Sequence, residues 1–96
     1  MLQQDTEGTE RRTLHKYVDF TGRRVLEIGC GDGRLTWKYA ADARSVTALD
    51  LEFDDLRVAI ADRPADLQAV ALLQADSTHL PFQKEKFDIA LLAWSL

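Results

Sequence analysis

The sequence predicts an α/β fold: an open parallel sheet, truncated, with the strand order 3-2-1-4 and flanking helices. Segments that suit strands alternate along the chain with segments that suit helices, which predicts parallel βαβ units with right-handed crossovers. A glycine-rich loop follows the first strand, where sheets of this type bind ligands. The composition, 46% hydrophobic and 29% charged over 96 residues, is that of one globular domain.

The chain begins with a polar stretch and a short helix. Residues 1–12 are predicted to form a flexible N-terminal segment. Leu14, Tyr17 and Val18 then recur at helical spacing and predict a short amphipathic helix. The folded domain is therefore expected to span residues 13–96.

The first strand is predicted at residues 24–28 (RVLEI), and a glycine loop at residues 29–33 (GCGDG) follows it. Residues 34–43 are rich in helix formers. Glycines at alternate positions let the backbone turn sharply and let a ligand approach main-chain atoms that a Cβ would shield. The succession of strand, glycine loop and helix predicts a ligand site above the first strand.

Three further strands complete the predicted sheet, and one more helix lies between the second and the third. The strands are expected at residues 45–50, 70–74 and 87–94. Phe53, Leu56 and Ile60 lie on one face of the helix predicted at residues 53–63. The last strand is a nearly unbroken apolar run, which suits a strand covered on both faces.

Composition excludes several classes of protein. The net charge is -4, from 12 basic and 16 acidic residues, and the basic residues are scattered, so a phosphate-binding footprint for nucleic acid is not expected. One cysteine excludes an internal disulfide, and two histidines with one cysteine make a four-ligand zinc site improbable. The polar N-terminus lacks a secretory signal, and no apolar run approaches the roughly 20 residues of a membrane helix. A cytoplasmic protein without a membrane partner is expected.

The spacing of the glycines narrows the choice of ligand. A dinucleotide-binding fingerprint has the spacing G-x-G-x-x-G, but Arg34 occupies the third glycine position and Gly33 comes one step early. Glu27 in the preceding strand would repel a pyrophosphate and would suit a ligand with an ammonium or sulfonium group. The loop therefore favours a cationic ligand over NAD.

Residues 27–33 (EIGCGDG) match, as they stand, the E-x-G-x-G-x-G loop of the class I S-adenosylmethionine-dependent methyltransferases, and the chain resembles this family. Asp50 closes the second strand, as the ribose-binding acid of the family does. Residues 75–82 (ADSTHLPF), followed by residues 87–90 (FDIA), resemble the D-x-x-x-L-P-F…F-D segment of its type 11 branch, which includes ubiquinone and menaquinone biosynthesis methyltransferases. The three segments occur in the order that the family has them.

The resemblance implies a Rossmann-like fold with S-adenosyl-L-methionine as the cofactor. It implies that the loop glycines shape the methionine side, that Asp50 holds the ribose and that Asp76 accepts from the adenine amino group. The complete expected cofactor-binding set is Glu27, Gly29, Cys30, Gly31, Gly33, Asp50, Leu51, Asp76, Ser77 and Trp94. No catalytic residue and no metal site is predicted.

Four side chains near this site also have simpler interpretations. Cys30 has no base beside it in the sequence and suits a small loop filler better than a nucleophile. Asp32 can stabilise the N-terminal end of the following helix without any ligand. His79 in a turn-rich loop is more often solvated than catalytic. Trp94 can belong to the core as well as to the crevice.

The resemblance also carries expectations about activity and assembly. Family members usually continue through three further strands that build most of the acceptor pocket, so a cofactor-binding half without that pocket is expected. Two functions stay open: a minimal or truncated methyltransferase acting on an unidentified small molecule, and a non-catalytic S-adenosylmethionine-binding module or oligomeric scaffold. An NAD-binding half-domain is a third interpretation. The apolar final run, residues 87–96, predicts a homodimer that forms through the C-terminal strand.

Overall fold

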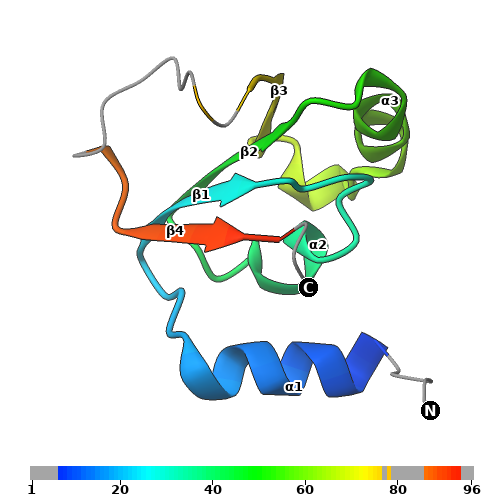
Figure 1. The fold of residues 1–96 in the computed structure, drawn as a ribbon. Helices are drawn as coiled ribbons and strands as arrows, with labels where there is room; N and C mark the ends of the chain where they lie inside the picture. Colours follow the sequence, from blue (N-terminus) through cyan, green and yellow to red (C-terminus); the bar gives the residue numbers. More distant parts are fainter. Residues whose placement is uncertain (1–6, 77, 79–85, 94–96) are drawn as a thin grey trace, which may run out of the picture.

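Four parallel strands form a single sheet in the computed structural model, which describes residues 7–76, 78 and 86–93. The strand order is β3-β2-β1-β4 (Figure 1), as predicted, and each neighbouring pair is parallel. The strands are β1 Arg24–Ile28, β2 Ser45–Asp50, β3 Ala71–Gln74 and β4 Ile89–Leu92. Since parallel strands end at the same edge, the segments that follow β1, β2 and β3 meet there.

The helices are placed as expected, but two have different lengths. They are α1 Glu7–Tyr17, α2 Thr36–Tyr39, α3 Phe53–Asp62 and the short 3₁₀ helix η1 Ala65–Leu67. The first, α1, already begins within the segment expected to be flexible. The second is much shorter than the predicted helix over residues 34–43, because the chain tightens after Tyr39 into i to i−3 hydrogen bonds, from Asp42 N–H to Tyr39 O and from Ala43 N–H to Ala40 O.

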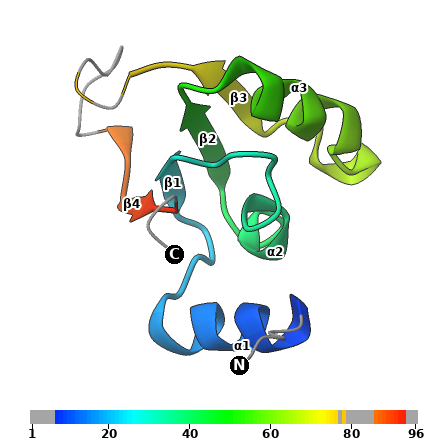
Figure 2. The same cartoon turned by 45° about the vertical axis from the view of Figure 1, so that its right-hand side comes forward.

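The core lies on one face of the sheet. Side chains alternate between the two faces of a strand, and Val25, Val46 and Ala48 share the face that packs against Tyr39 of α2 and Leu56 of α3. Figure 2 shows α1, α2 and α3 gathered beside the sheet. The helices therefore hold the sheet from one side and leave its carboxyl edge accessible.

The other face of the sheet is covered unevenly. Leu26 and Leu49 are buried, whereas Leu73 and Leu92, on the two outer strands, are 39% and 50% exposed. The expectation that the last strand is covered on both faces is wrong, because only one side of β4, which includes Leu91, packs on the core. A position at the edge of the described sheet accounts for this difference.

Two predicted helical faces are only partly correct. Leu14 of α1 and Val18, directly after that helix, pack on the core, but Tyr17 is 76% exposed. In α3 the buried residues are Leu56 and Ala59, while the predicted partners Phe53 and Ile60 are exposed. The small Ala59 side chain allows a close approach of the helix to the sheet, which turns the larger neighbours outward.

Candidate functional site

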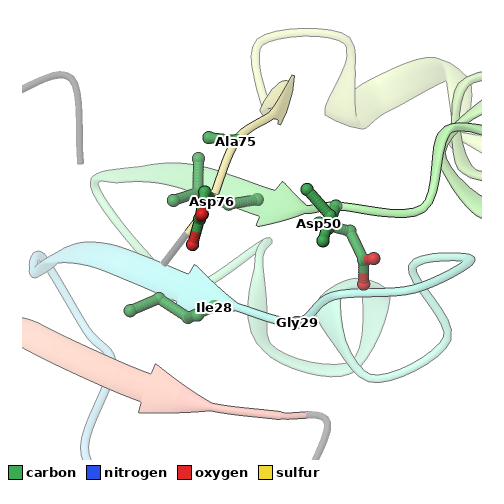
Figure 3. Close-up of a pocket in the computed structure, with 7 residues that line it drawn as sticks. Ile28, Gly29, Asp50, Ala75 and Asp76 are labelled. Atoms are coloured by element: carbon green, nitrogen blue, oxygen red, sulfur yellow. The ribbon is translucent and has the colours of Figure 1, made fainter. Parts of the chain in front are cut away.

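A cavity of about 260 Å³ opens at the carboxyl ends of β1, β2 and β3. It is lined by Ile28, Gly29, Leu49, Asp50, Leu51, Ala75 and Asp76 (Figure 3). The pairing of Ile28 with Leu49, and of Asp50 with Gln74, brings these strand ends side by side. Four members of the set predicted from the sequence therefore lie around one cavity: Gly29, Asp50, Leu51 and Asp76.

Asp50 connects the glycine loop to the turn after β2. Its Oδ2 accepts a hydrogen bond of 2.7 Å from the Gly31 N–H, and its Oδ1 accepts one of 2.8 Å from the Glu52 N–H. Figure 3 shows the carboxylate turned toward the loop that follows β1. Each carboxylate oxygen can accept a second hydrogen bond, so the half-buried Asp50 keeps acceptor capacity at the cavity.

The glycines of the loop serve different purposes. Gly29, Gly31 and Gly33 all have positive φ angles, of 82°, 57° and 87°, which other residues rarely adopt. A Cβ on Gly33 would lie 2.5 Å from the Trp37 ring, whereas a Cβ on Gly31 would meet nothing within 4 Å. Gly33 thus lets the loop pack on α2, while Gly31 leaves open space.

Glu27 does not line the cavity, contrary to the expectation that its carboxylate faces the ligand. It is fully buried, because strand alternation turns it toward α2. Its Oε1 accepts hydrogen bonds from Thr36 Oγ1 at 2.7 Å and from the Tyr39 hydroxyl at 2.6 Å, while Oε2 has no partner. Burial raises the pKa of Glu27, and the two hydrogen bonds oppose that rise.

Cys30 is buried in the loop beside two acids. Burial, together with the negative charges of Glu27 and Asp50, raises the pKa of the Cys30 thiol to about 12. The thiol is therefore protonated at neutral pH, which disfavours a nucleophilic role. Asp32 does not stand at the start of α2, which begins four residues later; its Oδ1 accepts from the Arg34 N–H at 3.1 Å and closes a turn.

The wall of the cavity on the β2 and β3 side is exposed. Leu51 is 62% exposed, and its carbonyl accepts a hydrogen bond of 3.0 Å from Gln74 Nε2. Asp76 Oδ1 accepts from both the N–H and the hydroxyl of Thr78, at 2.9 Å each. Ser77, His79 and Trp94 lie outside the described residues.

Sequence reasoning missed three lining residues and the partners of Glu27. Ile28, Leu49 and Ala75 have no chemical signature, although each lies at or just beyond the end of a predicted strand. Thr36 and Tyr39 stand three residues apart directly after the glycine loop, which places both on one helical face. That spacing, with an acid in the preceding strand, was the available signal.

Within the part of the chain that the structure describes, no group of three or more His, Cys, Asp and Glu side chains could hold a metal ion. A search of the same residues finds no helix with the length and apolarity needed to cross a membrane.

Comparison with known sequences places the chain in a family. The family described as "Methyltransferase domain" matches residues 25–96, which include β1 apart from its first residue, the glycine loop and β2, β3 and β4. The chain belongs to this family. The predicted resemblance of the chain to the methyltransferases is thereby confirmed.

Individual relatives agree with the family. A demethylmenaquinone methyltransferase from Renibacterium salmoninarum is 33% identical over 93 residues, which cover 93% of this methyltransferase domain and 38% of the relative. The crystal structure of a putative methyltransferase from Bacillus halodurans matches with a TM-score of 0.78 and 29% identity, over 88% of this chain and 38% of that one. An S-adenosylmethionine-dependent methyltransferase structure from Mesorhizobium loti matches with a TM-score of 0.70 and 26% identity, over 91% and 39% of the two chains. The domain thus spans well under half the length of these relatives.

Proposed function

We propose that this methyltransferase domain binds S-adenosyl-L-methionine in the cavity and forms the donor-binding part of an enzyme that methylates a small molecule. The observation that carries the proposal is Asp50, whose carboxylate fixes the glycine loop through Gly31 and still borders the cavity. The family match and the S-adenosylmethionine-dependent relative from Mesorhizobium loti support this choice of cofactor.

The chemistry of the lining residues fits the parts of this cofactor. The remaining acceptor capacity of Asp50 suits the two ribose hydroxyls. Leu51 offers an apolar surface and Asp76 an acceptor, which suits the adenine ring and its amino group. Gly29 lies on the side proposed for the methionine moiety, and the further proposed members of the site are Glu27, Cys30, Gly31, Gly33, Ser77 and Trp94.

The domain contributes positioning to the reaction. The cofactor supplies a methyl group on a sulfonium, which is already a good leaving group. Transfer forms a bond between the acceptor atom and the methyl carbon while the carbon–sulfur bond breaks, and sulfur keeps the electron pair. Asp50 and the glycine loop would fix the donor in line for this displacement, and no described residue needs to form a covalent bond.

Calorimetric titration of the 96-residue chain tests the cofactor assignment. We expect S-adenosylmethionine and S-adenosylhomocysteine to bind, and NAD to bind more weakly, because a pyrophosphate would lie near Glu27 and Asp50. Tighter binding of NAD than of both methionine-derived ligands would overturn the assignment.

Methyl transfer by this chain alone is expected to be slight. The described cavity contains groups for a donor, and none of its lining residues is assigned to an acceptor. A donor without an oriented acceptor loses the proximity contribution to catalysis. Robust turnover of a small acceptor by a verified 96-residue monomer would contradict this expectation. None of the relatives named above is a non-catalytic module, and we carry the enzyme hypothesis forward.

We further propose that the chain forms a homodimer through β4. This strand lies at the edge of the described sheet and presents Leu92, which is 50% exposed. Light scattering over a concentration series should show a dimer that Leu92→Lys shifts toward monomer. Leu73→Lys is the matched control, because it changes an exposed leucine on the opposite outer strand. A micromolar monomer, unaltered by Leu92→Lys, would overturn the proposal.

We propose the partners and the location of the protein from its charge and composition. Scattered basic residues and a net charge of -4 argue against a nucleic-acid partner. A cytoplasmic location is our proposal for the same chain.

A further inference from the structure

Two hydroxyl groups of α2 converge on a single oxygen of Glu27. Thr36 and Tyr39 both donate to Oε1, at 2.7 Å and 2.6 Å, and Oε2 is the one buried carboxylate atom of the described residues left without a partner. Glu27 is fully buried and stands next in sequence to Ile28 and Gly29, which line the cavity. A buried carboxyl group thus lies in β1 beneath the loop that borders the proposed cofactor site, with its side chain turned toward α2.

A buried carboxylate with one unpartnered oxygen is costly to maintain. Hydrogen bonds from neutral hydroxyls to the ionised form reduce that cost, and they also decide which oxygen is occupied. Because Thr36 and Tyr39 share Oε1, Oε2 is the atom that a further donor would satisfy. The two hydroxyls therefore influence both the charge and the orientation of Glu27.

Few other groups near Glu27 could change its charge or its orientation. Its partners in the neighbouring strands are Ala48 of β2 and Leu91 of β4, neither of which titrates. The titratable groups near it are Cys30, whose thiol is protonated at neutral pH, and Tyr39 itself. His15 of α1 lies farther out, against the ring of Phe20.

The ring of Tyr39 is held separately from its hydroxyl. It stacks on Phe20 with 4.4 Å between ring centroids and an interplanar angle of 17°, and it is fully buried. Removal of the hydroxyl alone would leave this contact intact. The role of the hydrogen bond can therefore be separated from the role of the ring in the core.

We propose that Tyr39 and Thr36 are positioning residues for the cofactor site. They hold Oε1 of Glu27 so that the carboxylate keeps its negative charge beneath the glycine loop, from where this charge attracts the positive charge of the bound ligand without touching it. This inference rests on the proposed function, because it needs a cationic ligand. It makes two residues outside the cavity responsible for the preference for a cation.

The central test compares Tyr39→Phe with the wild-type chain by calorimetry with S-adenosylhomocysteine between pH 5 and pH 8. Loss of this hydrogen bond disfavours the ionised form of Glu27, and we expect binding to weaken about tenfold at neutral pH. The donors favour the charged form of Glu27, so their removal raises its pKa. Affinity in the variant should therefore begin to fall at a higher pH than in the wild type as the solution is acidified. Thr36→Val should act in the same direction.

Tyr17→Phe is the matched control, because Tyr17 is 76% exposed and has no contact with Glu27 among the described interactions. It should change neither the affinity nor the pH profile. In the background of Glu27→Gln, the effect of Tyr39→Phe should disappear, because the positioning residue then has no charge to hold. Persistence of the tenfold loss in that background would overturn the proposal.

A measurement without ligand keeps the two proposals distinguishable. Carbon-13 NMR of the Glu27 carboxyl, assigned by its absence in Glu27→Gln, should show a higher titration midpoint in Tyr39→Phe than in the wild type or Tyr17→Phe. Unchanged midpoints overturn the positioning role whatever binds. A wild-type chain that binds neither S-adenosylmethionine nor S-adenosylhomocysteine overturns the proposed function instead, and with it the ligand on which the charge of Glu27 would act.

Discussion

The two sides of the cavity are built in different ways. On the β1 side, Glu27 and Gly33 are buried and are held by contacts with α2. On the side of β2 and β3, Asp50 is half-buried, and Leu51 and Asp76 are exposed at the cavity. One continuous motif, from the end of β1 through the glycine loop, therefore contains residues that fix the loop, whereas the residues that line the cavity come mainly from the neighbouring strands.

Gly33→Ala is the variant of the buried side from which we expect the largest effect. A Cβ would lie 2.5 Å from the Trp37 ring, and the backbone has a φ of 87° that alanine tolerates poorly. We expect a loss of about 3 kcal/mol in the free energy of unfolding, from strain and steric conflict together. Urea denaturation followed by Trp fluorescence measures it.

A second variant separates the two causes of that loss. Replacing Trp37 with Leu in the Gly33→Ala chain should restore part of the stability, because the ring that the Cβ meets is gone. If Gly33→Ala lowers the free energy of unfolding by less than about 1 kcal/mol, packing on α2 does not hold the loop in place. The difference that we describe between the two sides of the cavity would then be wrong.

Asp50→Ala is the corresponding test of the exposed side. It removes the proposed acceptor of the ribose hydroxyls and should weaken S-adenosylhomocysteine binding by about 1.5–3 kcal/mol. The variant also frees the Gly31 N–H, so Asp50→Asn is measured beside it, because the amide keeps one acceptor oxygen. We expect Asp50→Asn to lie between the alanine variant and the wild type. Asp54→Ala, at an exposed acid of α3, should leave the affinity unchanged.

Gly31→Ala tests whether two glycines of the same loop have different roles. A Cβ there meets nothing within 4 Å, so the φ of 57° should cost only about 1 kcal/mol of stability. If the open space belongs to the ligand, S-adenosylhomocysteine affinity should fall by more than that stability loss explains. Gly22→Ala is a matched control, since its φ of 69° is also positive, its surroundings are equally open, and it lies outside the loop. Equal affinities in both variants would limit Gly31 to a role in the turn.

The sequence was sufficient to predict the residues whose role depends on their order along the chain. The strand order, the meeting of Asp50 and Asp76, and the positive φ angles of the loop glycines all follow from strand ends, turns and spacing. The direction of Glu27 could not be predicted as easily, because both faces of a central strand are apolar and nothing local indicates which one an acid joins.

Packing decides the remaining differences. The length of α2 depends on the turn hydrogen bonds after Tyr39, and the burial of Ala59 in place of Ile60 depends on how closely α3 approaches the sheet. Neither property is encoded in helix propensity or periodicity alone. The predictions that were wrong therefore lie on surfaces where two elements meet, and those that were confirmed lie at the strand ends.

The smallest expected effect concerns the opposite end of β1, away from the cavity. Arg24 donates to Asp88 from Nε and from a terminal nitrogen, at 3.1 Å each, and from its backbone N–H at 2.9 Å. These bonds lower the pKa of Asp88 to about 2 from its ordinary value of 3.8. Because the folded-state pKa is the lower one, the contribution to stability is present above about pH 4 and is lost as the pH falls toward 2. The thermal midpoint of the wild type should decline over that range, and Asp88→Asn should decline less while binding S-adenosylhomocysteine normally at pH 7. A weaker affinity in Asp88→Asn would show that the amino end of β1 influences the cavity, and the difference between the two sides would then extend along the whole strand.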